Sequence, residues 1–97
     1  MIQSFKGKGT EDVFNGKNTK IDRKICPQSL WKIASRKLDQ IDSVQLIEEL
    51  RILPGNHPEA LSGDRIGEFS IRTNDQYRIC FKWAPNGLGQ VEITDYH

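Results

Sequence analysis

The sequence has 97 residues, of which 36% are apolar and 28% are charged, and this composition is typical of one globular domain spanning residues 1–97. No apolar run approaches the roughly 20 residues of a membrane-spanning helix, and residues 1–10 carry no secretory signal. We therefore expect a cytoplasmic protein that does not act in a membrane. Cys26 and Cys80 lie far apart and fit no metal-ligand spacing, so we expect two reduced thiols.

Charge is unevenly distributed along the chain, although the net charge is only +1. Residues 1–37 carry nine Lys and Arg against three acids, a net charge of +6, whereas residues 38–64 carry one Arg against six acids, a net charge of −5. A basic third in a nearly neutral protein favours a local contact with a polyanion over bulk packaging of nucleic acid. A solvated helical face has the same composition, so both interpretations stay open.

The first elements are predicted from short patterns. Residues 2–5, IQSF, are compatible with a short β-strand. Thr10 is then predicted to cap a short helical turn with acidic residues, and Gly16 or Asn18 is predicted to end it.

Residues 26–43, CPQSLWKIASRKLDQIDS, form the clearest predicted helix. Pro27 suits the first turn, where a missing N–H costs nothing. The helix is expected to pack on the core through apolar residues three or four positions apart and two flanking ones: Leu30, Ala34, Leu38, Ile41, Trp31 and Ile33. Residues 44–50 are predicted to continue as a second helical piece, and residues 54–65, which contain two Pro and two Gly, are predicted to form a loop.

From Glu68 onward the apolar residues alternate with a period of two, as in β-strands. Strands are predicted at residues 68–73, 76–83 and 90–96, with a hairpin turn at Asn74-Asp75. The predicted fold class is therefore α+β: an N-terminal strand, two to three helices, and an antiparallel meander of three strands packed on the helices.

Arg78 lies within an apolar strand pattern, where an unpaired charge is costly, so we expect it to have an acidic partner or a ligand. Its neighbours depend on the turn. A two-residue turn at Asn74-Asp75 places Arg78 opposite Ile71, whereas a loop with an odd number of residues separates an apolar face from a basic one. The sequence leaves both registers open, and with them the facing of Arg72 relative to Arg78.

Three residues that can handle protons or charge follow the last strand pattern: Asp95, Tyr96 and His97. Histidine titrates closest to neutral pH, so His97 is the natural proton carrier. Asp95 is placed to orient the imidazole, because residues i and i+2 share a strand face. Tyr96 is explained more readily as a residue that packs at the end of a strand.

These residues suit cleavage of RNA without a metal. The reaction needs a base for the 2′-hydroxyl, a cation for the phosphorane and an acid for the leaving 5′-oxygen. Arg78 suits the cation's role, because a guanidinium binds phosphate oxygens bidentately. The two histidines lie forty residues apart and no phosphate-binding loop is present, so we expect no metal and no other cofactor. Four further residues are candidate contacts to RNA, although each is also explained as an ordinary surface or loop residue: Lys6, Lys8, His57 and Arg65.

Three stretches together resemble a known family: MIQSFKGKG, LSGDRIGEFSIRTNDQYRICFKW and VEITDYH. In this order they resemble the HigB killer proteins of bacterial toxin–antitoxin systems, within the RelE/ParE superfamily. The resemblance implies a RelE-like fold and a ribosome-dependent endonuclease that cuts mRNA. It also implies a HigA-like helix-turn-helix antitoxin, through which alone the toxin would contact operator DNA.

The resemblance extends to the candidate site residues. Arg78 occupies the position at which the family keeps an arginine that holds the scissile phosphate. Asp95, Tyr96 and His97 occupy the positions of a C-terminal group that is catalytic or contacts the substrate.

One stretch departs from the family pattern. Better-studied relatives carry a histidine and a lysine directly before Gly-Asp, whereas this chain has Ser62 in the lysine's position and His57 two residues further upstream. The missing lysine implies a milder toxin, or one that uses another cation such as Arg65.

Two other functions remain open. The first is a weakly catalytic or non-catalytic module that the antitoxin binds as a corepressor, which the missing lysine at Ser62 motivates. The second is a gyrase-targeting toxin of the same superfamily, although that branch lacks the aromatic-Arg and Asp-Tyr-His patterns.

Overall fold

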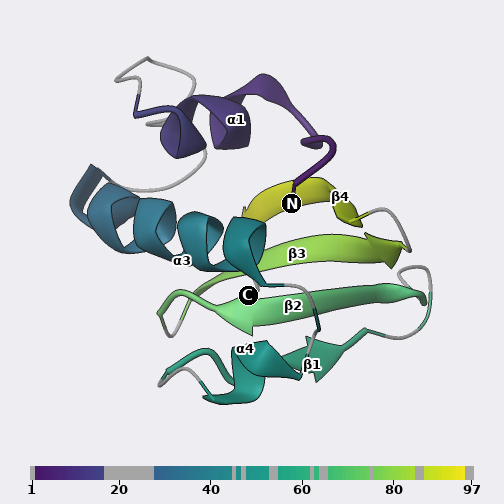
Figure 1. Cartoon of the computed structure of the whole chain (residues 1–97). Helices are drawn as coiled ribbons and strands as arrows, with labels where there is room; N and C mark the ends of the chain where they lie inside the picture. The colour runs from purple at the N-terminus through teal and green to yellow at the C-terminus, as the bar shows by residue number, and fades with distance from the viewer. Residues whose placement is uncertain are drawn as a thin grey trace.

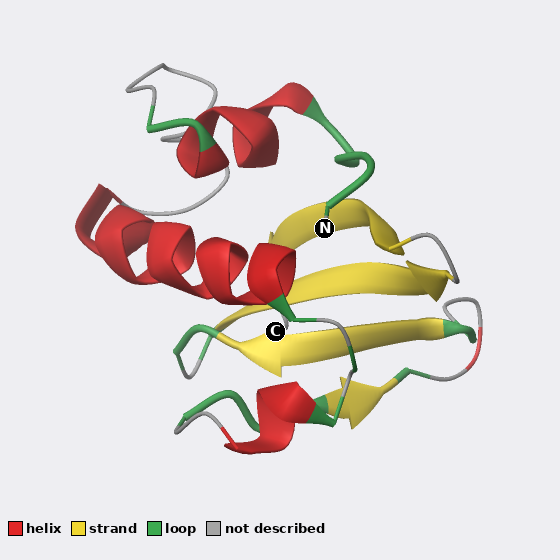
Figure 2. Ribbon diagram, in the orientation of Figure 1, coloured by secondary structure: helices red, strands yellow, loops and turns green. Residues whose placement is uncertain are grey.

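The computed structural model describes residues 2–16, 28–44, 46, 48–52, 55–61, 63, 66–74, 76–84 and 87–95. Its elements in chain order are α1 (Lys8–Phe14), η1 (Gln28–Leu30), α3 (Trp31–Ser43), α4 (Glu49–Ile52), β1 (Glu59–Ala60), β2 (Glu68–Arg72), β3 (Tyr77–Ala84) and β4 (Gly87–Asp95). α3 lies across one face of the sheet, and α4 lies beside β1 (Figure 1, Figure 2). The predicted α+β class is confirmed. No helix among the described residues is long and apolar enough to span a membrane.

The sheet has four antiparallel strands in the order β1-β2-β3-β4. β1 is a correction to the sequence prediction, because it lies within the stretch predicted to be a loop. A strand of two residues is too short for an alternating pattern, and it is held by pairing to β2. The predicted N-terminal strand adds to the opposite edge, where Ile2 and Phe5 form isolated parallel bridges with Leu88 and Val91 of β4.

The β2–β3 hairpin decides which residues share a face. The backbone N–H of Thr73 donates to the carbonyl of Tyr77 (3.0 Å), and the side chain of Asn74 accepts from the N–H groups of Gln76 and Tyr77 (2.9 and 2.7 Å). The loop therefore has an odd number of residues, and Arg72 pairs with Arg78. The two-residue turn is wrong, and the alternative that separates an apolar face from a basic face is confirmed. The Asx-type bonds of Asn74 favour this wider loop.

α1 begins earlier than predicted. Its N-cap is Gly7 at φ 104°, without a side-chain cap, and Thr10 lies inside the helix. The hydroxyl of Thr10 accepts a hydrogen bond from the backbone N–H of Ile93 (3.1 Å), which ties the buried side of α1 to β4. Thr10 was therefore wrongly predicted as the cap, because a tertiary contact uses its hydroxyl instead. Gly16 follows the helix at φ 77°, as predicted for its end; Asn18 lies outside the described residues.

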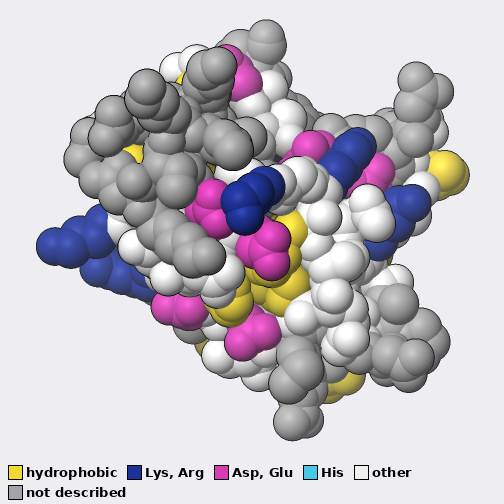
Figure 3. All heavy atoms as spheres, turned by 90° about the horizontal axis from the view of Figure 1, so that it is seen from above, with side chains coloured by type: hydrophobic (Ala, Val, Ile, Leu, Met, Phe, Trp, Pro, Cys, Tyr) yellow, Lys and Arg dark blue, Asp and Glu magenta, His cyan; other side chains and the backbone are white. Residues whose placement is uncertain are grey.

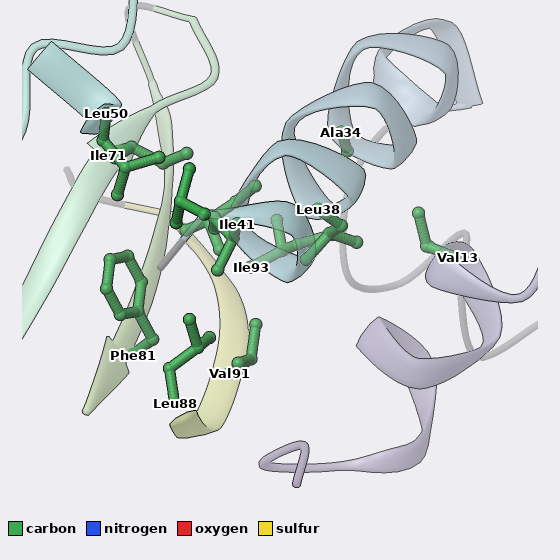
Figure 4. Close-up of a cluster of buried hydrophobic side chains, with 12 residues drawn as sticks. Val13, Ala34, Leu38, Ile41, Leu50, Ile71, Phe81, Leu88, Val91 and Ile93 are labelled. Carbon is green, nitrogen blue, oxygen red and sulfur yellow. The ribbon is translucent and has the colours of Figure 1, made fainter. Parts of the chain in front are cut away.

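α3 buries the predicted stripe against the sheet. Ala34, Leu38 and Ile41 are fully buried, and Leu30 and Trp31 pack at the margin of the core as predicted, whereas Ile33 is 39% exposed, so the stripe is narrower than predicted on one side. These side chains meet those of the strands in one cluster (Figure 4). The helix ends at Ser43, because the next residue is extended (φ −75°, ψ 146°).

The remaining predictions for this part of the chain meet mixed outcomes. The second helical piece is confirmed only in part, since α4 (Glu49–Ile52) includes Glu49 and Leu50 alone of the described residues in the predicted stretch 44–50. Cys80 is a buried thiol of β3, as expected. Pro27 and Cys26 lie outside the described residues.

Candidate functional site

The strands divide their side chains between two faces, because successive residues of a strand point to opposite sides. Ile71, Ile79 and Phe81 point to the core under α3. The other face, which we call the Arg78 face, is built by three sets of cross-strand neighbours: Glu68, Ser70 and Arg72 of β2; Arg78, Cys80 and Lys82 of β3; and Glu92 and Thr94 of β4. Cations, acids and hydroxyls thus gather on the face opposite the main helix.

Arg78 is the most firmly held cation of this face. Only 8% of it is exposed. Its Nε donates to the hydroxyl of Ser70 (2.8 Å), and its Nη2 donates to the backbone carbonyls of His57 (2.5 Å) and Ser70 (3.3 Å). These three acceptors are neutral oxygens, and together they fix the orientation of the guanidinium. A guanidinium whose orientation is fixed in advance loses little conformational entropy when it binds phosphate oxygens.

Arg72 lies directly across from Arg78 on the neighbouring strand and is half-buried. Like charges directly opposite one another in a sheet are unfavourable. The fold nevertheless brings two guanidinium-bearing residues together, which concentrates positive charge where a phosphodiester can be placed. Sequence analysis left the facing of Arg72 open, and the loop of the hairpin settles it.

His57 is brought to Arg78 by the fold, although the two residues are 21 positions apart. Its backbone has φ 41°, an unusual value for a residue other than glycine. The carbonyl faces Arg78, and the residue is exposed. His57 was a candidate from its residue type alone; no pattern in the sequence indicates the contact with Arg78, because it uses a backbone atom.

The two candidate lysines differ in their relation to this face. The side chain of Lys6 is 57% exposed and its Nζ lies 3.9 Å from Oε1 of Glu92, which belongs to the Arg78 face. An exposed ion pair of this kind contributes little stability, so Lys6 can exchange its carboxylate for a phosphate at small cost. Lys8 is exposed at the first residue of α1. In the view from above, Lys and Arg side chains lie among Asp and Glu side chains at the centre of the face (Figure 3).

Asp95 is not brought together with Arg78. The cross-strand neighbour of Arg78 on β4 is Thr94, so Asp95 belongs to the opposite face and pairs with Tyr77. Its exposed carboxylate accepts a hydrogen bond from the side-chain amide of Gln76 (2.9 Å). Of the residues that sequence analysis discussed for the site, Tyr96, His97, Arg65 and Ser62 lie outside the described residues.

Asn56, the residue before His57, is a buried polar residue that contacts α3. Lys37 donates from Nζ to the side-chain oxygen of Asn56. Burial lowers the pKa of the Lys37 ammonium from its ordinary value of 10.5, and the charge of Arg36 lowers that pKa further.

The lowered pKa of Lys37 predicts how stability changes with pH. The folded pKa lies below that of the unfolded chain, so the unfolded chain binds more protons between the two values. The contribution of Lys37 to the free energy of unfolding should therefore rise with pH through that window, up to 10.5. Urea unfolding at several alkaline pH values measures the slope. The Lys37→Met variant should show a smaller rise, and equal slopes for the two proteins would contradict the prediction.

Comparison with known proteins agrees with this fold. Residues 3–97 match the HigB-like toxin family, described as the RelE-like toxin of the type II toxin–antitoxin system HigB. The chain is 37% identical over 97 residues to toxin HigB-1 of Vibrio cholerae serotype O1, which covers 100% of this chain and 98% of that protein. It is 42% identical over 70 residues to an uncharacterized protein of Haemophilus influenzae, which covers 72% of this chain and 69% of that protein.

The fold is also found among solved structures. The YoeB–YefM complex from Staphylococcus aureus contains a chain that superposes with a TM-score of 0.60 at 20% identity, covering 100% of this chain and 95% of that one. At this identity the likeness concerns the fold, whereas the family match and the Vibrio cholerae relative span nearly the whole sequence. The chain belongs to the HigB-like family, the RelE-like toxins of type II toxin–antitoxin systems.

Proposed function

We propose that this toxin is an endoribonuclease that cuts mRNA on the translating ribosome, without a metal ion, and so inhibits translation. The observation that carries the proposal is the guanidinium of Arg78, oriented by Ser70 and His57 on the sheet face opposite α3, with Arg72 directly across from it. This arrangement is suited to stabilise the negative charge of the phosphorane that forms during RNA cleavage.

In the proposed reaction the 2′-oxygen forms a bond to phosphorus and the bond from phosphorus to the 5′-oxygen breaks. A base takes the proton of the 2′-hydroxyl, and an acid gives a proton to the leaving 5′-oxygen. We assign phosphate stabilisation to Arg78 and proton transfer to His97, with Tyr96 contacting the substrate. Asp95 lies on the sheet face opposite Arg78. In this scheme it therefore does not contact the phosphate beside Arg78, and its proposed role is to orient the imidazole of His97.

Contacts to the RNA backbone are assigned to basic residues around the Arg78 face. Lys6 is tied to Glu92 of that face, and the exposed His57 lies beside Arg78. Lys8 and Arg65 complete the proposed set. A ribosome that holds the mRNA supplies much of the positioning, which is consistent with so small a catalytic group.

The antitoxin is proposed to be a HigA-like helix-turn-helix protein that binds operator DNA and carries the toxin to it. The net charge of +6 in residues 1–37 favours an acidic surface on this partner. We place the pair in the cytoplasm, where translating ribosomes are found.

Mapping of mRNA 5′ ends after induced expression tests the proposal. We expect new ends within translated codons, and their loss when the antitoxin is co-expressed. Growth arrest with intact mRNA would contradict nuclease activity and favour the corepressor interpretation. DNA breaks with an SOS-type response would instead indicate a gyrase-targeting toxin.

A further inference from the structure

Asn56 is a fully buried polar residue at the junction of three elements. Its side-chain N–H groups donate to Oε1 of Gln40 on α3 and to the carbonyl of Leu50 on α4, both at 3.2 Å. Its side-chain oxygen accepts from Lys37 of α3. Its backbone carbonyl accepts from the N–H of Arg72 on β2 (2.6 Å). A buried amide bonded at each of these atoms is fixed in orientation, because losing any one bond leaves a buried group unsatisfied.

The same short segment holds both arginines of the Arg78 face. The carbonyl of Asn56 fixes the backbone of Arg72, and the next carbonyl, that of His57, accepts from the guanidinium of Arg78. His57 has φ 41°, a conformation that surrounding contacts must impose on a non-glycine residue. Asn56, the residue directly before it, is held by its side chain and by its backbone carbonyl.

We propose that Asn56 is a positioning residue for Arg78: its buried side chain sets the His57 carbonyl that orients the guanidinium. This inference rests on the proposed nuclease function. Displacement of the guanidinium should affect the transition state more than the binding of RNA. The phosphorane is stabilised only when the N–H groups of the guanidinium point at its oxygens.

The first test is spectroscopic and needs no activity. In wild type the Nε–H group of Arg78, which donates to Ser70, should give a resolved NMR signal that exchanges slowly with solvent. Asn56→Ala should shift this signal and accelerate its exchange. Asn56→Asp keeps the shape, loses the two N–H donations, and serves if the alanine variant does not fold.

Thr10→Val is the control, because Thr10 is also buried and its hydroxyl accepts a tertiary hydrogen bond from the N–H of Ile93 on β4. It should lower the melting temperature and leave the Arg78 signal in place. An unchanged Arg78 signal in a folded Asn56 variant, or equal changes in the Thr10 and Asn56 variants, would overturn the proposal.

The second test is kinetic, with ribosome-bound mRNA. Asn56→Ala should lower kcat by about 10–100-fold with KM nearly unchanged. In an Arg78→Lys background the same substitution should cost less than about threefold, because interacting residues are not additive. Equal losses in both backgrounds would reduce Asn56 to a structural residue. A wild-type protein that does not cut mRNA would instead remove the proposed function and leave the spectroscopic test standing.

Discussion

Replacement of Arg78 by lysine is expected to lower mRNA cleavage by about 10²–10³-fold, the usual effect of removing one preorganised donor from a charged transition state. Lysine keeps the positive charge but lacks the planar fork, so it cannot hold Ser70 and His57 and a phosphate oxygen together. Growth inhibition should be relieved in parallel. Single-turnover cleavage on purified ribosomes and growth after induction measure the two effects.

The control for this prediction is Arg36→Lys. Arg36 is also an arginine, but it is exposed on α3, which packs on the other sheet face, and the variant should cut mRNA as the parent does. A melting curve accompanies Arg78→Lys, because unsatisfied buried partners cost about 1–3 kcal/mol each. Full cleavage by a folded Arg78→Lys protein would show that charge alone suffices, and full cleavage by Arg78→Ala would place the site elsewhere.

Much of the fold follows from period alone. Ala34, Leu38 and Ile41 repeat at helical spacing and form the buried side of α3. The alternation after Glu68 predicts β2 and β3. In these segments local preference and tertiary packing agree, so a local pattern is sufficient. Ile33, at the margin of the stripe, is the exception: it is apolar but 39% exposed.

What the sequence did not predict is held by long-range hydrogen bonds. β1 forms because Glu59 and Ala60 pair with β2. The hydroxyl of Thr10 accepts a hydrogen bond from the backbone of β4. The odd loop of the hairpin depends on the side chain of Asn74. None of these contacts leaves a periodic signal, because each joins a single polar atom to a distant backbone group.

The candidate site shows the same division. Arg78 was identifiable because a long cation in an apolar strand needs a reason to be there. Its partners Ser70 and His57, and the buried Asn56 behind them, were not identifiable, since two of the contacts use backbone carbonyls. The sequence thus identifies the residue whose burial is unfavourable, and the structure identifies the hydrogen bonds that compensate for its burial.

His97→Gln is expected to lower cleavage by about 10²–10⁴-fold, the range for loss of a general acid or base. Glutamine keeps a polar group of similar size but cannot exchange a proton near neutral pH. In the variant the rate of cleavage should therefore no longer depend on pH around neutrality, because this dependence arises from a titrating imidazole. A pH–rate profile of single-turnover cleavage measures both effects.

Two other substitutions separate proton transfer by His97 from the alternatives. His57→Gln should weaken RNA binding, since His57 is exposed and its backbone contacts Arg78, whereas the dependence of the rate on pH near neutrality should persist. Asp95→Asn should have a smaller effect than His97→Gln, because Asp95 is exposed on the opposite face and its described partner is Gln76. If His97→Gln cuts as well as the parent and His57→Gln loses this pH dependence instead, proton transfer belongs to the histidine that the fold brings to Arg78. If both variants keep the parent's profile, the proton moves through a group of the ribosome, and the chain's own contribution is reduced to holding the phosphate.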